Sequence, residues 1–295
     1  MTQDNGTQGH PLTTLQQAQD AESETRDARV FDFEEGEIIL IDKPYDWTSF
    51  DVVNFIRALI KRFRGIHKLK VGHAGTLDPL ATGLLILCTG RKTKQIDDFQ
   101  ARIKTYTGTM LLGQTTPSFD LETEPDAFFD TAKITDEDLE HARQSFIGEI
   151  KQFPPKYSAV KIKGKRAFTY ARSDKEVELK ARDVTIEDFK IDSSEFPKIN
   201  FEVTCSKGTY IRSLVSDFGK QLGNGACLME LRRTRIGDLK VEDAWQLEDL
   251  KKEIMMDEYT TQDTRQKNTG HERYTISSRN KSQKPESNDM NQESI

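Results

Sequence analysis

The sequence predicts an α+β domain, in which a mixed, largely antiparallel sheet is flanked by helices. Three observations predict it: short apolar or alternating segments typical of strands, longer segments with apolar residues at helical spacing, and terminal stretches with almost no large aliphatic residues. The 295 residues are 35% hydrophobic and 31% charged, which is polar for one compact domain and indicates a folded core between tails.

The strands are expected where apolar residues alternate or cluster. They cover residues 36–44, 84–88, 101–113, 184–191, 200–206 and 227–237. Pro44 ends the first of these strands, because proline cannot continue the hydrogen-bond ladder. The segment LLILC at 84–88 is apolar throughout, so this strand is expected to be buried on both faces of the sheet.

Four helices are expected between the strands. They cover residues 48–63, 92–99, 135–148 and 209–223. Ser49 is the expected N-cap of the first helix, and acidic residues in the first turn of the third complement the helix dipole. Gly223 is the expected C′ glycine that ends the fourth.

These elements predict one domain with a tail on each side. Residues 1–35 form an acidic tail without periodicity, residues 36–252 form the folded domain, and residues 253–295 form a polar tail. Neither tail can bury enough apolar surface to offset the entropy of ordering, so both are expected to be disordered.

Charge is segregated along the chain, although the net charge of −6 argues at first against a polyanionic partner. Residues 1–35 alone carry −6, with eight acidic residues against two arginines. Residues 57–104 hold eleven basic and three acidic residues, and residues 156–166 are a second basic run. Residues 118–140 are acidic. The basic runs predict local contact with a polyanion, or a solvated charged surface.

The location expected from the sequence is the cytoplasm. No run of eighteen apolar residues is present, and the N-terminus has neither a cationic start nor an apolar stretch. The three cysteines, Cys88, Cys205 and Cys227, are widely spaced and suggest reduced thiols rather than a zinc site or a disulfide framework. No metal site is therefore expected.

The segment KVGHAGTLDPLATGLLILCTGRKTK at 70–94 has the densest functional signal. Its glycines permit turns, and Pro79 keeps Asp78 away from helical geometry, so a lone carboxylate lies on a loop before an apolar strand. An isolated Asp-Pro is usually a simple turn. A glycine-rich loop before a strand can also hold a phosphate, but the G-K-[ST] ending of a P-loop is missing. The residues alone predict a functional loop and name no reaction.

The same segment closely resembles the TruB family of tRNA pseudouridine synthases. Five further segments resemble this family in the same order: 39–53, 104–113, 153–172, 201–223 and 230–237. The resemblance covers roughly residues 36–250, and the pairing of GTLDP with KGTYIR at this separation is very specific. It implies a pseudouridine synthase-like fold and an isomerase that needs neither cofactor nor metal.

The family breaks the C1′–N1 bond of a uridine, rotates the uracil and rejoins it through C5. The resemblance implies that the substrate is the T-loop uridine, position 55 of tRNA. Asp78 matches the nucleophile, which attacks either C1′ of the sugar or C6 of the uracil. Arg212 matches its fixed positive partner, which is expected to keep the pKa of Asp78 low.

Other residues match positions around the bound RNA. Tyr106 matches the tyrosine that stacks on the target base, and its alternative is a strand aromatic in the core. Tyr210 matches an active-site tyrosine that removes the C5 proton or orders the site. Lys43 and His73 match positions near the RNA, where capping or solvated roles are the alternatives. The second basic run is expected to contact phosphates through Lys161, Lys163 and Lys165.

Two departures from the family qualify this interpretation. Many bacterial members continue into a small C-terminal RNA-binding domain, whereas the folded part of this chain is expected to stop near Lys252. Ala74 also stands where many relatives have threonine. The expected partner is the T arm and elbow of tRNA, bound by a monomer. The alternatives are a guide-RNA-dependent synthase, a tRNA-folding module that has lost chemistry, and a phosphate-binding small-molecule enzyme.

Overall fold

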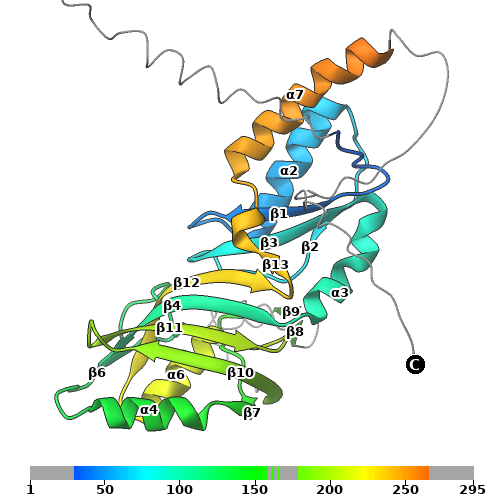
Figure 1. Cartoon of the computed structure of the whole chain (residues 1–295). Helices are drawn as coiled ribbons and strands as arrows, with labels where there is room; N and C mark the ends of the chain where they lie inside the picture. Colours follow the sequence, from blue (N-terminus) through cyan, green and yellow to red (C-terminus); the bar gives the residue numbers. More distant parts are fainter. Residues whose placement is uncertain (1–29, 159–160, 163–164, 167–178, 266–295) are drawn as a thin grey trace, which may run out of the picture. The chain divides into compact units, whose positions relative to one another are not determined.

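The computed structural model describes residues 30–158, 161–162, 165–166 and 179–265 (Figure 1). Its main sheet has the strand order β1-β3-β12-β4-β11-β10-β7, with β2 added on β3 and β13 on β12. The strands are β1 (Ile38–Lys43), β2 (Val71–His73), β3 (Ala81–Thr89), β4 (Lys104–Leu112), β7 (Gly148–Gln152), β10 (Arg182–Asp192), β11 (Lys198–Cys205), β12 (Ala226–Ile236) and β13 (Leu239–Lys240).

The sheet is mixed and largely antiparallel, as predicted. Every neighbouring pair is antiparallel except β12 and β3, whose pairing is parallel. Two short hairpins lie outside this sheet: β5 (Gln114–Thr115) with β6 (Ala127–Phe128), and β8 (Lys161–Ile162) with β9 (Lys165–Arg166). The sheet therefore joins chain segments that are more than a hundred residues apart, as in the register of β4 against β12.

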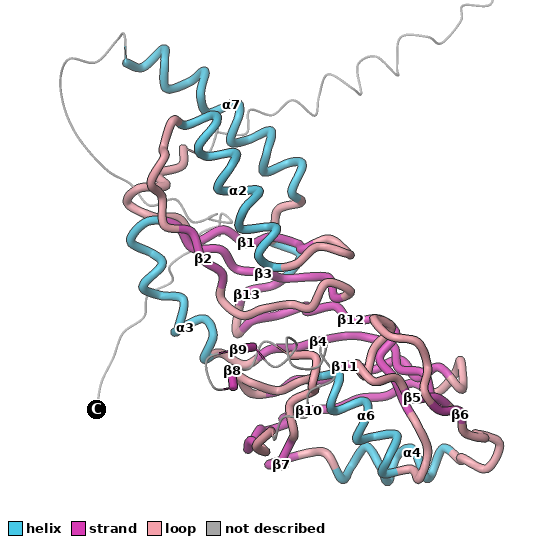
Figure 2. The backbone as a smooth tube through the Cα atoms, turned by 180° about the vertical axis from the view of Figure 1, so that it is seen from behind, coloured by secondary structure: helices cyan, strands magenta, loops and turns pink. Residues whose placement is uncertain are grey.

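The helices and 3-10 turns flank this sheet. They are α2 (Ser49–Arg64), η1 (Gly90–Gln95), α3 (Ile96–Ala101), α4 (Asp136–Ser145), α6 (Ile211–Gln221), η2 (Val241–Asp243) and α7 (Leu247–Arg265). Both views show α2 beside the first turns of α7, next to β1 and β3 (Figures 1 and 2). The expected α+β class is confirmed.

Strand β3 is buried on both faces, as its apolar sequence predicts. Leu85 and Leu87 pack into the cluster with α2 and α7, whereas Leu84 and Ile86 pack against α3 and the end of β12. The alternation follows from the two-residue period of a strand. Because β3 begins directly after the Asp78 loop, this double burial gives the loop a rigid support.

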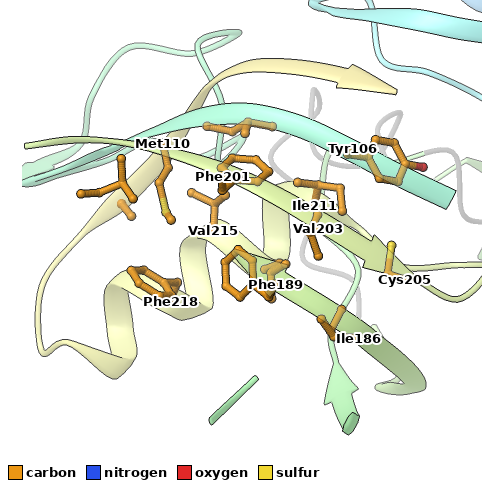
Figure 3. Packing of buried hydrophobic residues seen from close by; sticks show 14 of the residues in the cluster. Tyr106, Met110, Ile186, Phe189, Phe201, Val203, Cys205, Ile211, Val215 and Phe218 are labelled. Carbon is orange, nitrogen blue, oxygen red and sulfur yellow. The ribbon is translucent and has the colours of Figure 1, made fainter. Parts of the chain in front are cut away.

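A second core supports the other half of the sheet (Figure 3). Helix α6 packs Val215 and Phe218 against β4, β10 and β11, and the ring of Phe218 meets the ring of Phe189 edge to face at 5.9 Å. Burying aromatic side chains of this size stabilises the domain by roughly 1.5–3 kcal/mol each. Helix α6 is thereby fixed on the sheet, with its first turn at one end of the core.

The N-cap of α2 differs from the expected one. Thr48, not Ser49, caps the helix, because its hydroxyl accepts from the amide of Asp51 and the Asp51 carboxylate accepts from the amide of Thr48. The sequence T-S-F-D thus forms a capping box one residue earlier than predicted. Gly223 follows α6 with φ of 64°, as expected of a C′ glycine.

Both predicted domain boundaries differ from the packed structure. Phe31 and Phe33 belong to the segment predicted as a disordered tail, yet both are buried and their rings stack at 5.0 Å. Helix α7 crosses the expected boundary at Lys252, and its Ile254 is fully buried. Both segments are polar on average, so their composition does not reveal the few apolar residues that pack onto the domain. The predicted disorder of 1–29 and 266–295 lies outside the described residues.

The described part of the chain contains no helix that is both long and apolar enough to cross a membrane. Its three cysteines are separate, buried, free thiols.

Candidate active site

Asp78 lies on the loop 74–80, which connects β2 to β3. Gly75 has a φ of 99°, a conformation that favours glycine. The backbone can therefore change direction at Gly75, three residues before Asp78. Ser49 fixes the next part of the loop: its Oγ accepts from the amide of Leu77 at 2.9 Å and donates to the carbonyl of Leu77 at 3.2 Å. The loop is therefore held from the first turn of α2.

Arg212, in the first turn of α6, holds the carboxylate of Asp78. Its Nε donates to Asp78 Oδ2 at 2.9 Å, and Asp120 Oδ2 lies 3.4 Å from the same nitrogen. Its two terminal nitrogens donate to the carbonyls of Ser118, at 3.0 Å, and Tyr157, at 2.7 Å. The Arg212 side chain is 4% exposed, and each of its three guanidinium nitrogens donates to a partner. The predicted ion pair of Asp78 and Arg212 is present.

Asp120 is not among the predicted site residues, because the sequence places it in the acidic run 118–140 and charge alone does not distinguish it from its neighbours. It is 5% exposed and points to the guanidinium. Thr116 and Ser118 donate their hydroxyls to its carbonyl, at 2.7 and 3.2 Å, and Glu122 donates its amide to its carboxylate at 3.0 Å. Hydroxyl residues just before an acid are a signal of such a turn, and could have identified it.

The electrostatic environment of Asp78 differs from the expectation. Removal from water raises the pKa of this carboxyl, the charge of Arg212 lowers it, and the charge of Asp120 raises it again. The net direction is upward, whereas the sequence predicted a lowered pKa. The side chain is nevertheless 40% exposed, because it lies at the wall of an open pocket that a substrate can enter.

A pocket of about 660 Å³ collects the four residues that the sequence predicted as catalytic. They are Asp78, Tyr106, Tyr210 and Arg212. This volume is within the range of ligand sites, about 300–1,000 Å³. Arg182, Lys207 and Lys104 also line the pocket, so positive side chains surround the place where Asp78 is accessible. The chain therefore builds one site from segments that are far apart in sequence.

Tyr106 and Tyr210 reach the pocket from different elements. Tyr106 is on β4 and lies at one end of the core formed with α6, so its alternative role as a core aromatic is also met (Figure 3). Tyr210 is the N-cap residue of α6, and the side chain of Gln152 fixes its backbone: the Gln152 amide accepts from the nitrogen of Tyr210 at 2.8 Å and donates to its oxygen at 3.1 Å. Burial raises the pKa of both phenols.

Lys43 has the capping role that the sequence left as an alternative to direct contact with RNA. It is fully buried, and its ammonium donates to the carbonyls of Pro44, Trp47 and Pro79. Burial lowers the pKa of Lys43 to about 8, against the charge of Asp78, which raises it. Lysine is rarely buried, and here the burial braces the turn next to Asp78.

The remaining residues predicted to contact RNA either do not line the pocket or have side chains outside the described part of the structure. His73 is half-buried at the end of β2 and is not among the residues that line the pocket. The backbones of Lys161 and Lys165 belong to the β8–β9 hairpin, and their side chains lie outside the described part of the structure, as does Lys163 altogether.

Part of the first basic run has a structural role. Arg57 donates to the carbonyl of Val71, and Arg64 donates to the carbonyl of Phe31 with its guanidinium 5.7 Å from the ring of Phe33. These contacts brace the segments around α2. The charge count of residues 57–104 therefore overstates the number of cations that a polyanion can contact.

Within the described ranges, no group of three or more histidine, cysteine, aspartate or glutamate side chains is arranged to hold a metal ion.

Comparison with known families gives two adjoining matches. The family described as "TruB family pseudouridylate synthase (N terminal domain)" matches residues 61–211, and "tRNA pseudouridylate synthase B C-terminal domain" matches residues 212–268. Arg212 is thus the first residue of the second match. The second match also extends past Lys252, where the sequence predicted the folded part to end.

Curated relatives share about half of their residues with this chain. The "tRNA pseudouridine synthase B" of Phocaeicola vulgatus is 53% identical over 216 residues, which cover 73% of this chain and 92% of that protein. The protein of the same name from Bacteroides thetaiotaomicron is 50% identical over 227 residues, covering 75% and 94%.

Among solved structures, the chain is similar to one titled "Crystal Structure of a Cbf5-Nop10-Gar1 Complex", with 26% identity and a TM-score of 0.56. The alignment covers 77% of this chain and 60% of that one. The "Structure of H/ACA RNP bound to a substrate RNA containing 2'-deoxyuridine" matches with 27% identity and a TM-score of 0.53, over 75% of this chain and 53% of that one. The chain therefore spans little more than half the length of these structural relatives.

Proposed function

The chain belongs to the TruB family of pseudouridylate synthases, and we propose that it converts the uridine at position 55, in the T loop of tRNA, to pseudouridine. The observation that carries the proposal is the pair of Asp78 and Arg212 at the wall of an open pocket. A carboxylate that is reachable by a substrate, yet held by a buried guanidinium, is suited to act as a nucleophile.

Asp78 is the nucleophile in this proposal. Its oxygen forms a bond to C1′ of the uridine while the C1′–N1 bond breaks and its electron pair leaves with the uracil. The alternative is addition of the carboxylate to C6 of the uracil ring, before the glycosidic bond breaks. In both routes the uracil turns, C5 bonds to C1′, the carboxylate is released and the C5 proton is removed.

Two tyrosines prepare the base. The target uridine must leave the stacked T loop before Asp78 can reach it, so the enzyme flips it into the pocket. We assign Tyr106 to stacking on the uracil, which contributes about 1–3 kcal/mol. We assign Tyr210 either to removal of the C5 proton or to ordering of the site, since its backbone is fixed by Gln152.

The RNA backbone is gripped outside the pocket. We propose that the lysines at 161, 163 and 165 contact phosphates of the T arm, and that His73 lies near the bound RNA. Lys43 has no such role in this proposal because its ammonium is enclosed by three carbonyls. We further propose that the protein acts as a monomer in the cytoplasm and needs neither cofactor nor metal.

One assay tests the reaction and its nucleophile. Purified protein, with no guide RNA and no added metal, is incubated with tRNA carrying C5-tritiated uridine, and released tritium is counted. The parent should release tritium from position 55. Asp78→Asn should release none while its Kd for tRNA stays within several-fold, because the amide keeps the shape but cannot form the covalent bond.

The outcomes separate the candidate functions. Release that begins only when a guide RNA is added would identify the guide-dependent type instead. Binding without release would identify a folding module. Activity of Asp78→Asn above a few per cent of the parent would contradict the assignment of the nucleophile.

The grip on phosphates has its own test. Reversal of Lys161, Lys163 and Lys165 to Glu should weaken binding to all RNAs alike and flatten the dependence of log Kd on log salt by roughly two units, about 0.7 for each lost contact. The choice of uridine should not change, since phosphate contacts position the RNA without specifying its sequence. Reversal of the exposed Glu137 and Glu195 to Lys is the control and should leave the salt dependence unchanged. Equal effects of the two sets would contradict this placement of the RNA.

A further inference from the structure

We propose that Arg233 is a further positioning residue of the reaction, which braces the loop of the nucleophile and supplies the pocket with a positive charge for the uracil as it leaves the sugar. This inference rests on the proposed function and concerns a residue outside the pair of Asp78 and Arg212.

The sheet brings Arg233 to the centre of the site. On β12 it lies opposite Tyr106 of β4 in the antiparallel register and opposite Gly83 of β3 in the parallel one. A Cβ atom added to Gly83 would lie 2.3 Å from the carbonyl oxygen of Arg233 and 2.7 Å from its nitrogen, so only glycine allows this approach of the two strands. The side chain of Arg233 is 1% exposed and lines the pocket.

The guanidinium of Arg233 connects the nucleophile loop to β3. Its Nε donates to the carbonyl of Leu84 at 2.7 Å, and one terminal nitrogen donates to the carbonyl of Gly75 at 3.1 Å. Gly75 is three residues before Asp78, on the same loop. The contact therefore fixes the start of the loop, while Ser49 fixes its middle.

Arg233 differs from most buried arginines because, among the described residues, no carboxylate forms an ion pair with it. Burying a charge costs several kcal/mol unless a counter-charge compensates for it. The two carboxylates at the site, Asp78 and Asp120, are already shared by Arg212. A lone buried cation beside a pocket indicates that its counter-charge arrives with a ligand or develops during a reaction.

Two buried lysines show a similar arrangement: Lys104 lines the pocket, and Lys43 lies against the turn next to Asp78. Lys43 and Lys104 are buried and donate to backbone carbonyls, and neither forms an ion pair within the described ranges. Burial lowers the pKa of each to about 8, and the charge of Arg233 contributes to the lowering. Arginine stays protonated under such conditions, so Arg233 is the permanent cation of this group.

The proposed chemistry produces the anion that this charge would stabilise. When Asp78 bonds to C1′, the electron pair of the C1′–N1 bond goes to the uracil, and the negative charge spreads over N1, O2 and O4. When Asp78 instead adds to C6, the charge develops on C5 and O4. A fixed, buried cation at the wall of the pocket stabilises either anion more than it stabilises the neutral uridine, so it increases the rate rather than the affinity.

Two variants of Arg233 separate its charge from its hydrogen bonds. Arg233→Gln retains donors for the carbonyls but loses the charge, and Arg233→Lys retains the charge but loses the planar fork. Arg232→Met is the matched control: the neighbouring side chain is 40% exposed and pairs with Asp42. Single-turnover rate at saturating tRNA, Kd for tRNA and melting temperature are measured for each protein.

We expect the single-turnover rate of Arg233→Gln to fall by about 10²-fold with Kd within several-fold, as for loss of one transition-state donor. The single-turnover rate of Arg233→Lys should be about tenfold higher than that of Arg233→Gln, and the rate of Arg232→Met should stay close to that of the parent. A rate of Arg233→Gln close to the parent, or equal losses for Gln and Lys, would overturn the inference. If the Gln variant does not fold, Arg233→Lys decides: a rate no better than about 10²-fold below the parent overturns the inference. An inactive parent would contradict the proposed function instead.

Discussion

The buried positive charges of Arg212 and Arg233 have different partners. Both guanidiniums are almost fully buried, and both donate to backbone carbonyls. Arg212 also meets two carboxylates, whereas Arg233 meets none among the described residues. In the proposed reaction, the first region holds the nucleophilic carboxylate in one position, and the second supplies positive charge to the substrate in the pocket.

The structure around Arg212 is specific for the planar fork of an arginine. One nitrogen faces the two carboxylates and the other two each face one carbonyl. Replacing one partner of such a buried pair usually costs about 3–5 kcal/mol, because the remaining charge has lost its compensation. Substitutions in this region should therefore lower the free energy of unfolding more than equivalent substitutions on the exposed face of the sheet.

The largest effect is expected for Arg212→Lys. Lysine keeps the charge but cannot reach Asp78, Ser118 and Tyr157 at once, so the carboxylate is no longer fixed. The single-turnover rate should fall by about 10²-fold or more, with the circular dichroism spectrum unchanged. A variant as active as the parent would show that the ion pair does not set the geometry of the nucleophile.

A smaller effect is expected for Asp120→Asn. The amide can still accept from the amide of Glu122, but Arg212 then faces only one carboxylate. We expect the single-turnover rate to fall by roughly tenfold. Glu124→Gln, an exposed acid of the same segment, should leave the rate unchanged. If both variants behave alike, the region around Arg212 contains only one carboxylate that matters.

The dependence of the rate on pH tests whether the carboxylates of Asp78 and Asp120 interact. The pKa of Asp78 is raised, so the carboxylate loses its charge at a higher pH than an ordinary aspartate, whose pKa is about 3.9. The rate should therefore fall, as the pH is lowered, before that value is reached. Asp120→Asn removes a charge that raises this pKa, and should move the acid limb to lower pH. A limb that stays in place would show that the two carboxylates do not interact.

The smallest effect is expected at the start of α2. Ser49→Ala removes both hydrogen bonds to Leu77 and should lower the free energy of unfolding by about 1–2 kcal/mol, with a rate loss of only a few-fold. Thr48→Ala removes the cap and should cost about 1 kcal/mol without changing the rate, because the cap does not touch the nucleophile loop. Urea denaturation and single-turnover rates measure both. A larger rate loss for Thr48→Ala would contradict this division.

Much of the site was predictable from local sequence. The run TLDP fixes a carboxylate on a loop before a buried strand, because proline excludes helical geometry and the following residues are apolar throughout. The resemblance of this run and of KGTYIR to one family identified Asp78 and Arg212 as partners, although 134 residues separate them. The pairing in the structure agrees.

The errors share a physical cause. Lys43 was expected near the bound RNA from the resemblance, with a capping role as the alternative, and the carbonyls of the adjacent turns do cap its ammonium. Asp120 was grouped with its acidic neighbours, since charge patterning does not distinguish one inward side chain from several outward ones. Phe31 and Phe33 were assigned to a tail because local composition cannot show that helix α2 covers them.

By itself, therefore, the sequence determined the order and type of six strands and four helices, because hydrophobic period, caps and turn residues act over a few positions. It did not predict the short strands β2, β7 and β13 or helix α7. Through motifs it also led to the assignment of Asp78 as the proposed nucleophile and of Arg212 as its partner. Only the tertiary structure decided how the other buried charges, those of Asp120, Lys43 and Arg233, are placed. The register of β12 between β3 and β4 places Arg233 against Tyr106 and the Gly75 loop. The fold of residues 116–122 turns Asp120 towards Arg212. Burial and pairing depend on contacts between distant segments, and these set the electrostatic energy of every ionised group in the pocket.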